Sequence, residues 1–313
     1  MRVGVNKEKL LPLIYLVPLI AFIIVPLIVK QRYVYTLLTE IVIFMIFAIS
    51  FNILFGFTGI VSIGHAAYFG TAAYISALLV TKLEIHIIIS ILIVLILSVL
   101  LSLCFSGLTL RLKGSYFTLV TMAFAQMIYY GALKWNSLTG GDDGLFGIFP
   151  SGFLASRENY YFFTLIIFVL VFAFQHRFVV SPTGKILRAI KENEDRVKML
   201  GYNVIVFKTT SIILSGIIAS IAGVLYGCFI NFVYPSLLGI DTSSQVLEMV
   251  MIGGQGTLEG PLVGAFIIKI LSHLLSSQFR QWPIIIGVVF IIVVVFMPNG
   301  IVGLLKNKTR ENY

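Results

Sequence analysis

The stretch GGQGTLEGP, residues 253–261, interrupts the apolar segment 244–279 with four glycines and one proline. The apolar residues before it, 244–252, would form a helix only about 14 Å long at ~1.5 Å per residue. That length is about half the ~30 Å thickness of the hydrocarbon core of a bilayer. Pro261 suits the first turn of a second helix, which continues as LVGAFIIKILSHLL. The stretch therefore predicts a broken or re-entrant helix pair over 244–279.

The composition around this break is that of an integral membrane protein. Of the 313 residues, 59% are hydrophobic and only 11% are charged, and the mean hydropathy is +1.03. A soluble domain of this size does not need so much apolar surface, whereas a polytopic helical membrane protein does. The net charge of +9 is spread over short clusters between apolar runs, which argues against a nucleic-acid-binding patch. We expect an all-α, polytopic integral membrane protein in which residues 1–313 form a single transmembrane domain.

Besides the broken segment 244–279, eight apolar runs approach the ~20 residues that a membrane-spanning helix needs. They are 10–29, 34–55, 60–80, 85–107, 116–133, 159–176, 206–230 and 282–303. The first is long and lacks a small-residue cleavage site, so we expect a retained span rather than a cleaved signal peptide. The sequence thus predicts about eight full crossings plus the broken helix pair.

The distribution of Lys and Arg gives the orientation of these spans. Basic residues concentrate in the loops on the N-terminal side of the membrane, so the N-terminus is expected inside the cell. The basic C-terminal residues also favour the inside, which requires 244–279 to enter and leave on the outer side. A single crossing there would place the C-terminus outside, and the sequence leaves both arrangements open.

A second glycine-rich break, GFTGIVSIGHAAYFGTAAY, occupies residues 56–74. Paired half-helices of this kind form substrate sites in many transporters, since irregular backbone at membrane depth is tolerated only against protein or water. Close helix packing through small residues is the alternative explanation. The candidate residues for a polar translocation path are Ser62, Gly64, His65, Gly253, Gly254, Gln255, Gly256, Thr257 and Glu259.

The long outer loop 134–158 reads KWNSLTGGDDGLFGIFPSGFLASRE. Its Gly, Pro and Asp residues argue for an ordered loop with turns rather than a strand. Asp142 and Asp143 could meet an external partner or line an entrance, and an ordinary solvated turn is the equal alternative.

The inner segment 181–205 is the longest charged stretch of the chain. Ser181 or Thr183 can cap the start of a helix, Pro182 suits its first turn, and Gly201 can end it. Apolar residues at helical spacing predict one amphipathic stripe, interrupted by Asn193: Ile186, Ile190, Val197 and Leu200. A helix that only binds lipid is usually mostly basic, whereas this one carries three acids within 192–195. The mixed charge favours docking to a protein partner, with the membrane surface as the alternative.

The sequence has no recognisable motif for chemistry of its own. A P-loop reads G-x-x-x-x-G-K-[ST], and the nearest tripeptide, TGK at 183–185, lacks the first glycine and is followed by isoleucine. Cys104 and Cys228 lie in apolar runs without disulfide or metal-ligand spacing. A proton-driven carrier would have carboxylates within its spans, but the three candidates lie near span ends or a break: Glu40, Glu248 and Glu259. We expect no enzyme activity, no metal site and no cofactor bound by this chain.

Seven stretches in order along the chain carry a family resemblance over most of residues 50–305. They are GFTGIVSIGHAAYFGTAAYISALL, GSYFTLVTMAFAQMIY, TGGDDGL, SPTGKILRAIKENEDRVKMLGYNV, LSGIIASIAGVLYG, MIGGQGTLEGPLVGAF and MPNGIVGLL. Together they resemble the permease subunits of bacterial ABC importers for branched-chain amino acids, specifically the M-type (LivM-like) subunit. The A-I-x-E-N-E core of the inner segment is typical of that type. Asp142 and Met297 depart from the family pattern, which often has a small residue and an arginine there.

The resemblance implies a permease subunit of an ATP-driven importer that moves Leu, Ile and Val across the bacterial inner membrane. It implies a second, homologous permease subunit, two ABC ATPase subunits that carry ATP-Mg, and a periplasmic or lipid-anchored substrate-binding protein. The inner segment 181–205 would then be the cytoplasmic coupling segment, with ATPase contacts at Arg188, Glu192, Asn193 and Arg196. A permease for urea, amides or other amino acids in the same architecture, and a self-sufficient carrier or channel, are the alternatives.

Overall fold

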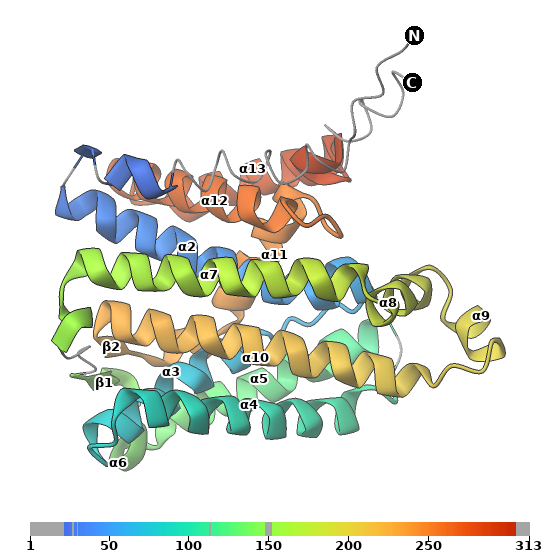
Figure 1. The fold of residues 1–313 in the computed structure, drawn as a ribbon, viewed down its shortest axis with the longest axis horizontal. Helices are drawn as coiled ribbons and strands as arrows, with labels where there is room; N and C mark the ends of the chain where they lie inside the picture. Colours follow the sequence, from blue (N-terminus) through green and yellow to red (C-terminus); the bar gives the residue numbers. More distant parts are fainter. Residues whose placement is uncertain (1–21, 27, 30, 113, 148–151, 305–313) are drawn as a thin grey trace, which may run out of the picture.

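The computed structural model describes residues 22–26, 28–29, 31–112, 114–147 and 152–304, which are mostly helical (Figure 1). Its longer helices are α2 (Arg32–Asn52), α3 (Ala66–Thr81), α4 (Ile87–Thr109), α5 (Ser115–Lys134), α7 (Arg157–Val180), α10 (Val204–Ile230), α11 (Ile240–Gly253), α12 (Gly260–Ser276) and α13 (Trp282–Phe296). The shorter ones are α6 (Asn136–Thr139), α8 (Pro182–Glu192), α9 (Glu194–Met199), a π-helical turn η1 (Ile53–Thr58), and the 3-10 turns η2 (Gly141–Asp143), η3 (Gly152–Ala155) and η4 (Pro235–Leu238). The described residues also include two short strands, β1 (Leu145–Phe146) and β2 (Phe232–Val233).

Six helices within the described residues are long and apolar enough to cross a membrane. They are α2 continued by η1, α4, α5, α7, α10, and α13 continued to Leu304. The expected span 60–80 is instead the shorter helix α3, because its first residues belong to the break. Most of the expected first span, 10–29, lies outside the described residues. The chain is therefore a multi-pass membrane protein, and its predicted total of eight crossings stays a prediction.

Helices α2 and α10 form the centre of the bundle. Every residue of α2 from Ile41 to Asn52 is buried, and α10 packs against α2, α3 and α4. A helix that is apolar all round is stable in a membrane protein only where neighbouring helices or lipid surround it. By contrast, α4, α5 and α13 expose many large apolar side chains. The outer helices thus leave their apolar faces for lipid or for another membrane subunit.

The two ends of the bundle differ in structure. Helices α8 and α9 project from one end, and the β1–β2 pair lies at the opposite end (Figure 1). Following the charge pattern, we call these the inner and the outer end. The outer loop contains helical turns, as expected, but Leu145 and Phe146 also pair antiparallel with Val233 and Phe232. The expectation that no strand forms there was wrong, because the partner strand comes from a distant segment.

Helices α11 and α12 form a hairpin that turns back at the inner end. At one end of α12 the His273 ring lies 5.1 Å from that of Tyr33, at the start of α2, whereas the turn before α12 bonds to Asn52, at the end of α2. With 14 and 17 residues, the helices are about 21 and 26 Å long at ~1.5 Å per residue. Both are shorter than the ~30 Å hydrocarbon core. The predicted pair forms a helix hairpin that begins at Ile240 rather than at residue 244, while its re-entrance into the membrane stays a prediction.

Candidate functional site: the paired helix breaks and the inner segment

Asn52, the last residue of α2, joins the two helix breaks. Its Nδ2 donates to the backbone carbonyl of Thr257 at 2.8 Å, and its Oδ1 accepts from the backbone N–H of Gly256 at 3.0 Å. The Asn52 side chain is fully buried. These hydrogen bonds satisfy backbone groups that the irregular turn 254–259 would otherwise leave unpaired. Two breaks that lie far apart in the sequence are therefore in direct contact.

The first break begins where α2 widens into the π-helical turn η1. Gly59, with φ of +77°, ends this turn in a left-handed conformation that favours glycine. The N–H of Ile60 then donates to the carbonyl of Leu54 at 3.0 Å, which closes the helix end. Irregular backbone follows to His65, and α3 begins at Ala66. This break matches the predicted discontinuity in the first half of the chain.

His65 connects the start of α3 to α2 through a hydrogen bond and a ring contact. Its Nε2 lies 2.8 Å from the hydroxyl of Ser50, and its ring stacks on Phe47 with centroids 5.4 Å apart. The hydroxyl of Ser243 on α11 accepts from the N–H of Ala66 at 2.9 Å. His65 is fully buried, and within the described residues its Nδ1 has no hydrogen-bond partner. In this conformation His65 is part of a packed joint between α2, α3 and α11.

The second break is closed largely by Thr257. Its hydroxyl donates to the carbonyl of Gly254 at 2.8 Å and accepts from the N–H of Gly260 at 2.9 Å. Gly254 and Gly256 have φ of +125° and +73°, which side chains other than glycine rarely adopt. The glycines and Thr257 thus shape the turn, and Gln255 is one of its partly exposed side chains.

The nine candidate path residues fall into two groups in this structure. Those that are buried in packed contacts are Ser62, Gly64, His65, Gly253 and Gly254, and those that are partly exposed are Gln255, Gly256, Thr257 and Glu259. Glu259 also lines an apolar groove of about 720 Å³ between α2, α7 and α12. The structure brings the two breaks together, while contact with a transported substrate stays a prediction for all nine.

The inner segment is two helices rather than one. Asn193 has an extended backbone, with φ −158° and ψ 99°, and its side chain accepts from the N–H of Arg196 at 2.9 Å to cap α9. Ser181 caps α8, and Gly201 follows α9 with φ of +86°, as the sequence indicates. The predicted single stripe was wrong at its end because the break resets the helical register. Leu200 is exposed, whereas the buried inner cluster consists of Leu187, Ile190, Val197 and Val204.

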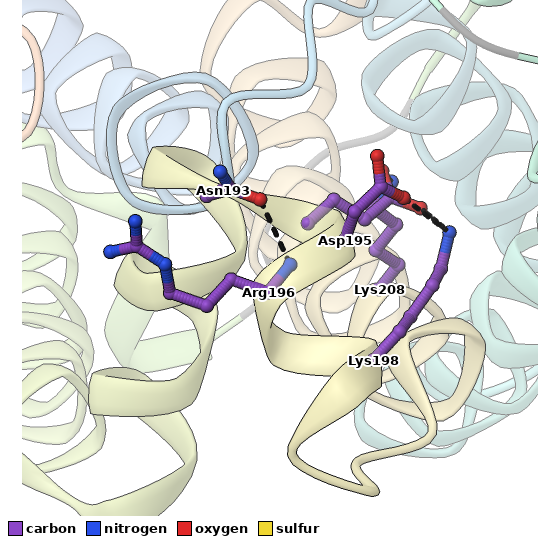
Figure 2. Close-up of polar contacts among 6 residues, drawn as sticks. Asn193, Asp195, Arg196, Lys198 and Lys208 are labelled. Atoms are coloured by element: carbon purple, nitrogen blue, oxygen red, sulfur yellow. Dashed lines mark hydrogen bonds and ion pairs between the residues drawn. The ribbon is translucent and has the colours of Figure 1, made fainter.

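A charged network holds α9 against the start of α10. Glu194 pairs with Lys198 at 2.7 Å and with Lys208 at 2.6 Å. Burial by itself raises the pKa of Glu194, but the hydrogen bonds and charges of Lys198 and Lys208 outweigh it and lower the pKa to about 2. Figure 2 shows the side chain of Arg196 directed away from this network.

The four residues predicted to contact an ATPase all lie on the inner segment and are exposed: Arg188, Glu192, Asn193 and Arg196. Two of them also have structural contacts, because Asn193 caps α9 and the Arg188 guanidinium lies 5.2 Å from the centre of the Phe57 ring. Their contact with a partner subunit stays a prediction. In the outer loop, Asp142 and Asp143 are exposed on η2, which fits both an external contact and a solvated turn.

Several residues outside the predicted set contact the breaks. Asn52 is one of them, and its signal was available as a polar residue in an apolar run just before a glycine-rich segment. Another is Lys191 on α8, whose Nζ donates to the carbonyl of Gly56 at 2.8 Å. Nothing in the local sequence distinguishes Lys191 from the other lysines of the inner segment, so only the tertiary structure identifies it.

Comparison with known proteins places this architecture in a family. The model of the branched-chain amino acid transport system permease component matches residues 33–297. The chain is 24% identical to the high-affinity branched-chain amino acid permease LivM of Escherichia coli, over 97% of this chain and 77% of the relative. It is also 24% identical to a probable LivM of Methanocaldococcus jannaschii over 61% of each chain, and 27% identical to LivH of Escherichia coli over 39% of this chain and 40% of the relative.

No solved structure matches this chain. The family match, in contrast, includes both helix breaks, the inner segment and all the described helices from α3 to α12. Because that match covers most of the sequence, the protein belongs to the family of permease components of branched-chain amino acid transport systems.

Proposed function

We propose that this permease is the membrane subunit of an ATP-driven ABC importer that moves leucine, isoleucine and valine into the cell across the inner membrane. The family match over residues 33–297 is the observation that carries the proposal. The similarity to LivM relatives over nearly the whole chain supports the same substrate class. The α11–α12 hairpin supports a topology of eight crossings with both termini inside.

The proposed assembly contains a second, homologous permease, two ATPase subunits that bind ATP-Mg, and a substrate-binding protein outside the membrane. Similarity to relatives named LivM and to relatives named LivH supports the pairing of two related permeases. The large apolar surfaces of α4, α5 and α13 offer area for a membrane-embedded partner as well as for lipid. ATP hydrolysis is assigned to the partner subunits, since this chain has no P-loop.

Uptake of labelled leucine at micromolar concentration tests the substrate. Deletion of the gene in a cell without a redundant system is expected to abolish uptake, and a plasmid copy is expected to restore it. Unlabelled isoleucine and valine should compete, whereas urea should not. Unchanged uptake after deletion would refute the proposal.

A second candidate is a permease of the same architecture with another small substrate. One relative, 23% identical over 47% of this chain, is named an autoinducer 2 import permease, so the similarity extends beyond relatives named for amino-acid transport. Competition by urea, amides or other amino acids in the uptake assay would favour this candidate. A self-sufficient carrier or channel would transport after reconstitution of this chain alone, without ATP.

The orientation and the coupling role are tested with single cysteines in a Cys104→Ser/Cys228→Ala background. Arg196→Cys is preferable to Asn193→Cys, because Asn193 caps α9. The thiol introduced at position 196 is expected to crosslink to the ATPase and to resist impermeant reagents added outside. Asp142→Cys, at the outer end, is the matched control and should be labelled from outside. Labelling of Arg196→Cys from outside would refute the topology.

A further inference from the structure

Lys191 connects the inner segment to the first helix break. Its Nζ donates to the carbonyl of Gly56 at 2.8 Å, although the two residues lie 135 positions apart. Gly56 belongs to η1, at the end of a helix, where carbonyl groups carry partial negative charge and favour a cation. Much of the Lys191 side chain is exposed, but partial burial lowers its pKa, and the Gly56 carbonyl replaces one water contact of the ammonium group.

The hydrocarbon chain of Lys191 packs in a space that glycine provides. A Cβ added to Gly59 would lie 2.9 Å from Lys191 Cγ, closer than ordinary van der Waals contact. One helical turn earlier on α8, Arg188 lies over the ring of Phe57. Residues three apart share a helix face, so one face of α8 is fastened to η1.

The same contacts reach the second break. A Cβ added to Gly56 would lie 2.5 Å from the backbone nitrogen of Gly256, and that nitrogen already donates to Asn52. Gly56, Asn52 and Gly256 therefore form one packed unit without space between them. Closely packed groups transmit movement to their neighbours. We therefore expect a displacement of α8 to move Gly56, Asn52 and Gly256 as well.

We propose that Lys191 is a positioning residue that transmits movement of the inner segment to the paired helix breaks through Gly56 and Asn52. The inference rests on the proposed function, because it takes an ATPase as the source of that movement. It does not require that the break residues contact substrate. Lys191 is not itself assigned to the substrate path or to the ATPase surface.

The test compares uptake with ATP hydrolysis in the complete transporter reconstituted in vesicles. Lys191→Met keeps the hydrocarbon chain and removes the ammonium group, and Lys191→Arg keeps the charge. For Lys191→Met, the amount of substrate moved per ATP is expected to fall about ten-fold, since a hydrogen bond to a charged group corresponds to about that factor in an equilibrium. Lys191→Arg should recover most of the loss. Lys185→Met replaces another exposed lysine of the same helix, is the matched control and should behave as wild type.

A second measurement does not depend on substrate identity. In the cysteine-free background, the labelling rate of Gln255→Cys is expected to change when the ATPase is trapped with nucleotide. Lys191→Met should abolish that change, and Lys185→Met should keep it. If vesicles with the wild-type transporter take up no branched-chain amino acid, the proposed substrate is wrong. The labelling comparison still decides the role of Lys191 in that case.

Two results would overturn the inference. One is that Lys191→Met moves the wild-type amount of substrate per ATP and also keeps the wild-type change in the labelling rate of Gln255→Cys. The other is failure of Lys191→Met to assemble, because Lys191 would then act on the stability of the complex rather than on coupling.

Discussion

The ammonium group of Lys269 on α12 lies 2.9 Å from Oε1 of Glu40 on α2, and 3.2 Å from the centre of the Phe44 ring. Lys269 occurs in an apolar run, where an isolated charge would be costly. The ion pair and the aromatic face compensate for much of that cost. The pair therefore connects α12, the second helix of the hairpin, to the central helix α2.

The two members of this pair are not equally exposed, and this predicts an asymmetry. The Lys269 side chain is 9% exposed and that of Glu40 is 29% exposed. Glu40→Gln removes the ion-pair partner of the more buried charge and should cost about 3 kcal/mol, and Lys269→Met should cost less. The double variant Glu40→Gln/Lys269→Met should be more stable than Glu40→Gln alone. Thermal unfolding in detergent measures these differences, and purely additive effects would contradict the pairing.

Replacement of Asn52 should loosen the second break. Asn52→Leu is of similar size but leaves the N–H of Gly256 and the carbonyl of Thr257 without their partner, at a cost of about 1–3 kcal/mol for each buried group. Hydrogen exchange over residues 254–259 should become faster. Ser76→Ala is the control, because the buried Ser76 hydroxyl donates to the carbonyl of Ala73 within its own helix. Unchanged hydrogen exchange in Asn52→Leu would show that the turn does not need the two hydrogen bonds of Asn52.

The hairpin depends on close contact between its two helices at Gly264. A Cβ there would overlap the backbone carbonyl of Met249, so Gly264→Ala should destabilise the protein by about 1–3 kcal/mol, as overpacking does elsewhere. Gly107→Ala on α4 is the matched control, since among the described residues no atom beyond the nearby backbone of its own helix lies within 4 Å of the added Cβ. That variant should be neutral or slightly stabilising because Ala has the higher helix propensity. The comparison is made by thermal unfolding, and equal effects at both sites would contradict the close approach.

The Glu194 network predicts a dependence on pH. The folded-state pKa of Glu194, about 2, is lower than its ordinary value of 4.5. Its stabilising contribution is therefore complete above pH 4.5 and is lost as the pH falls toward 2. Glu194→Gln should lower the unfolding temperature near neutral pH, and the difference from wild type should shrink below about pH 4.5. Asp195→Asn should have little effect, because Asp195 is 72% exposed and 3.6 Å from Lys198. A constant difference across this pH range would exclude the ionised Glu194 as its source.

The sequence by itself determined the membrane class, the positions of most long helices and the two breaks. These features are local: hydrophobic runs define the spans, and clustered glycines with a proline define the interruptions. It also located the inner segment, with Ser181 and Gly201 as its start and end signals. The order of motifs along the chain was enough for the family resemblance.

The tertiary structure decided which of these elements touch. Asn52 and Gly256, Lys191 and Gly56, and Glu40 and Lys269 are each separated by more than a hundred residues, and no local pattern states their pairing. The structure also shows that the inner segment divides at Asn193, whose side chain caps α9. A helix break can be read from local backbone preferences, but its partner depends on how the whole chain packs, because buried backbone and charged groups are satisfied by whichever residues the fold brings beside them.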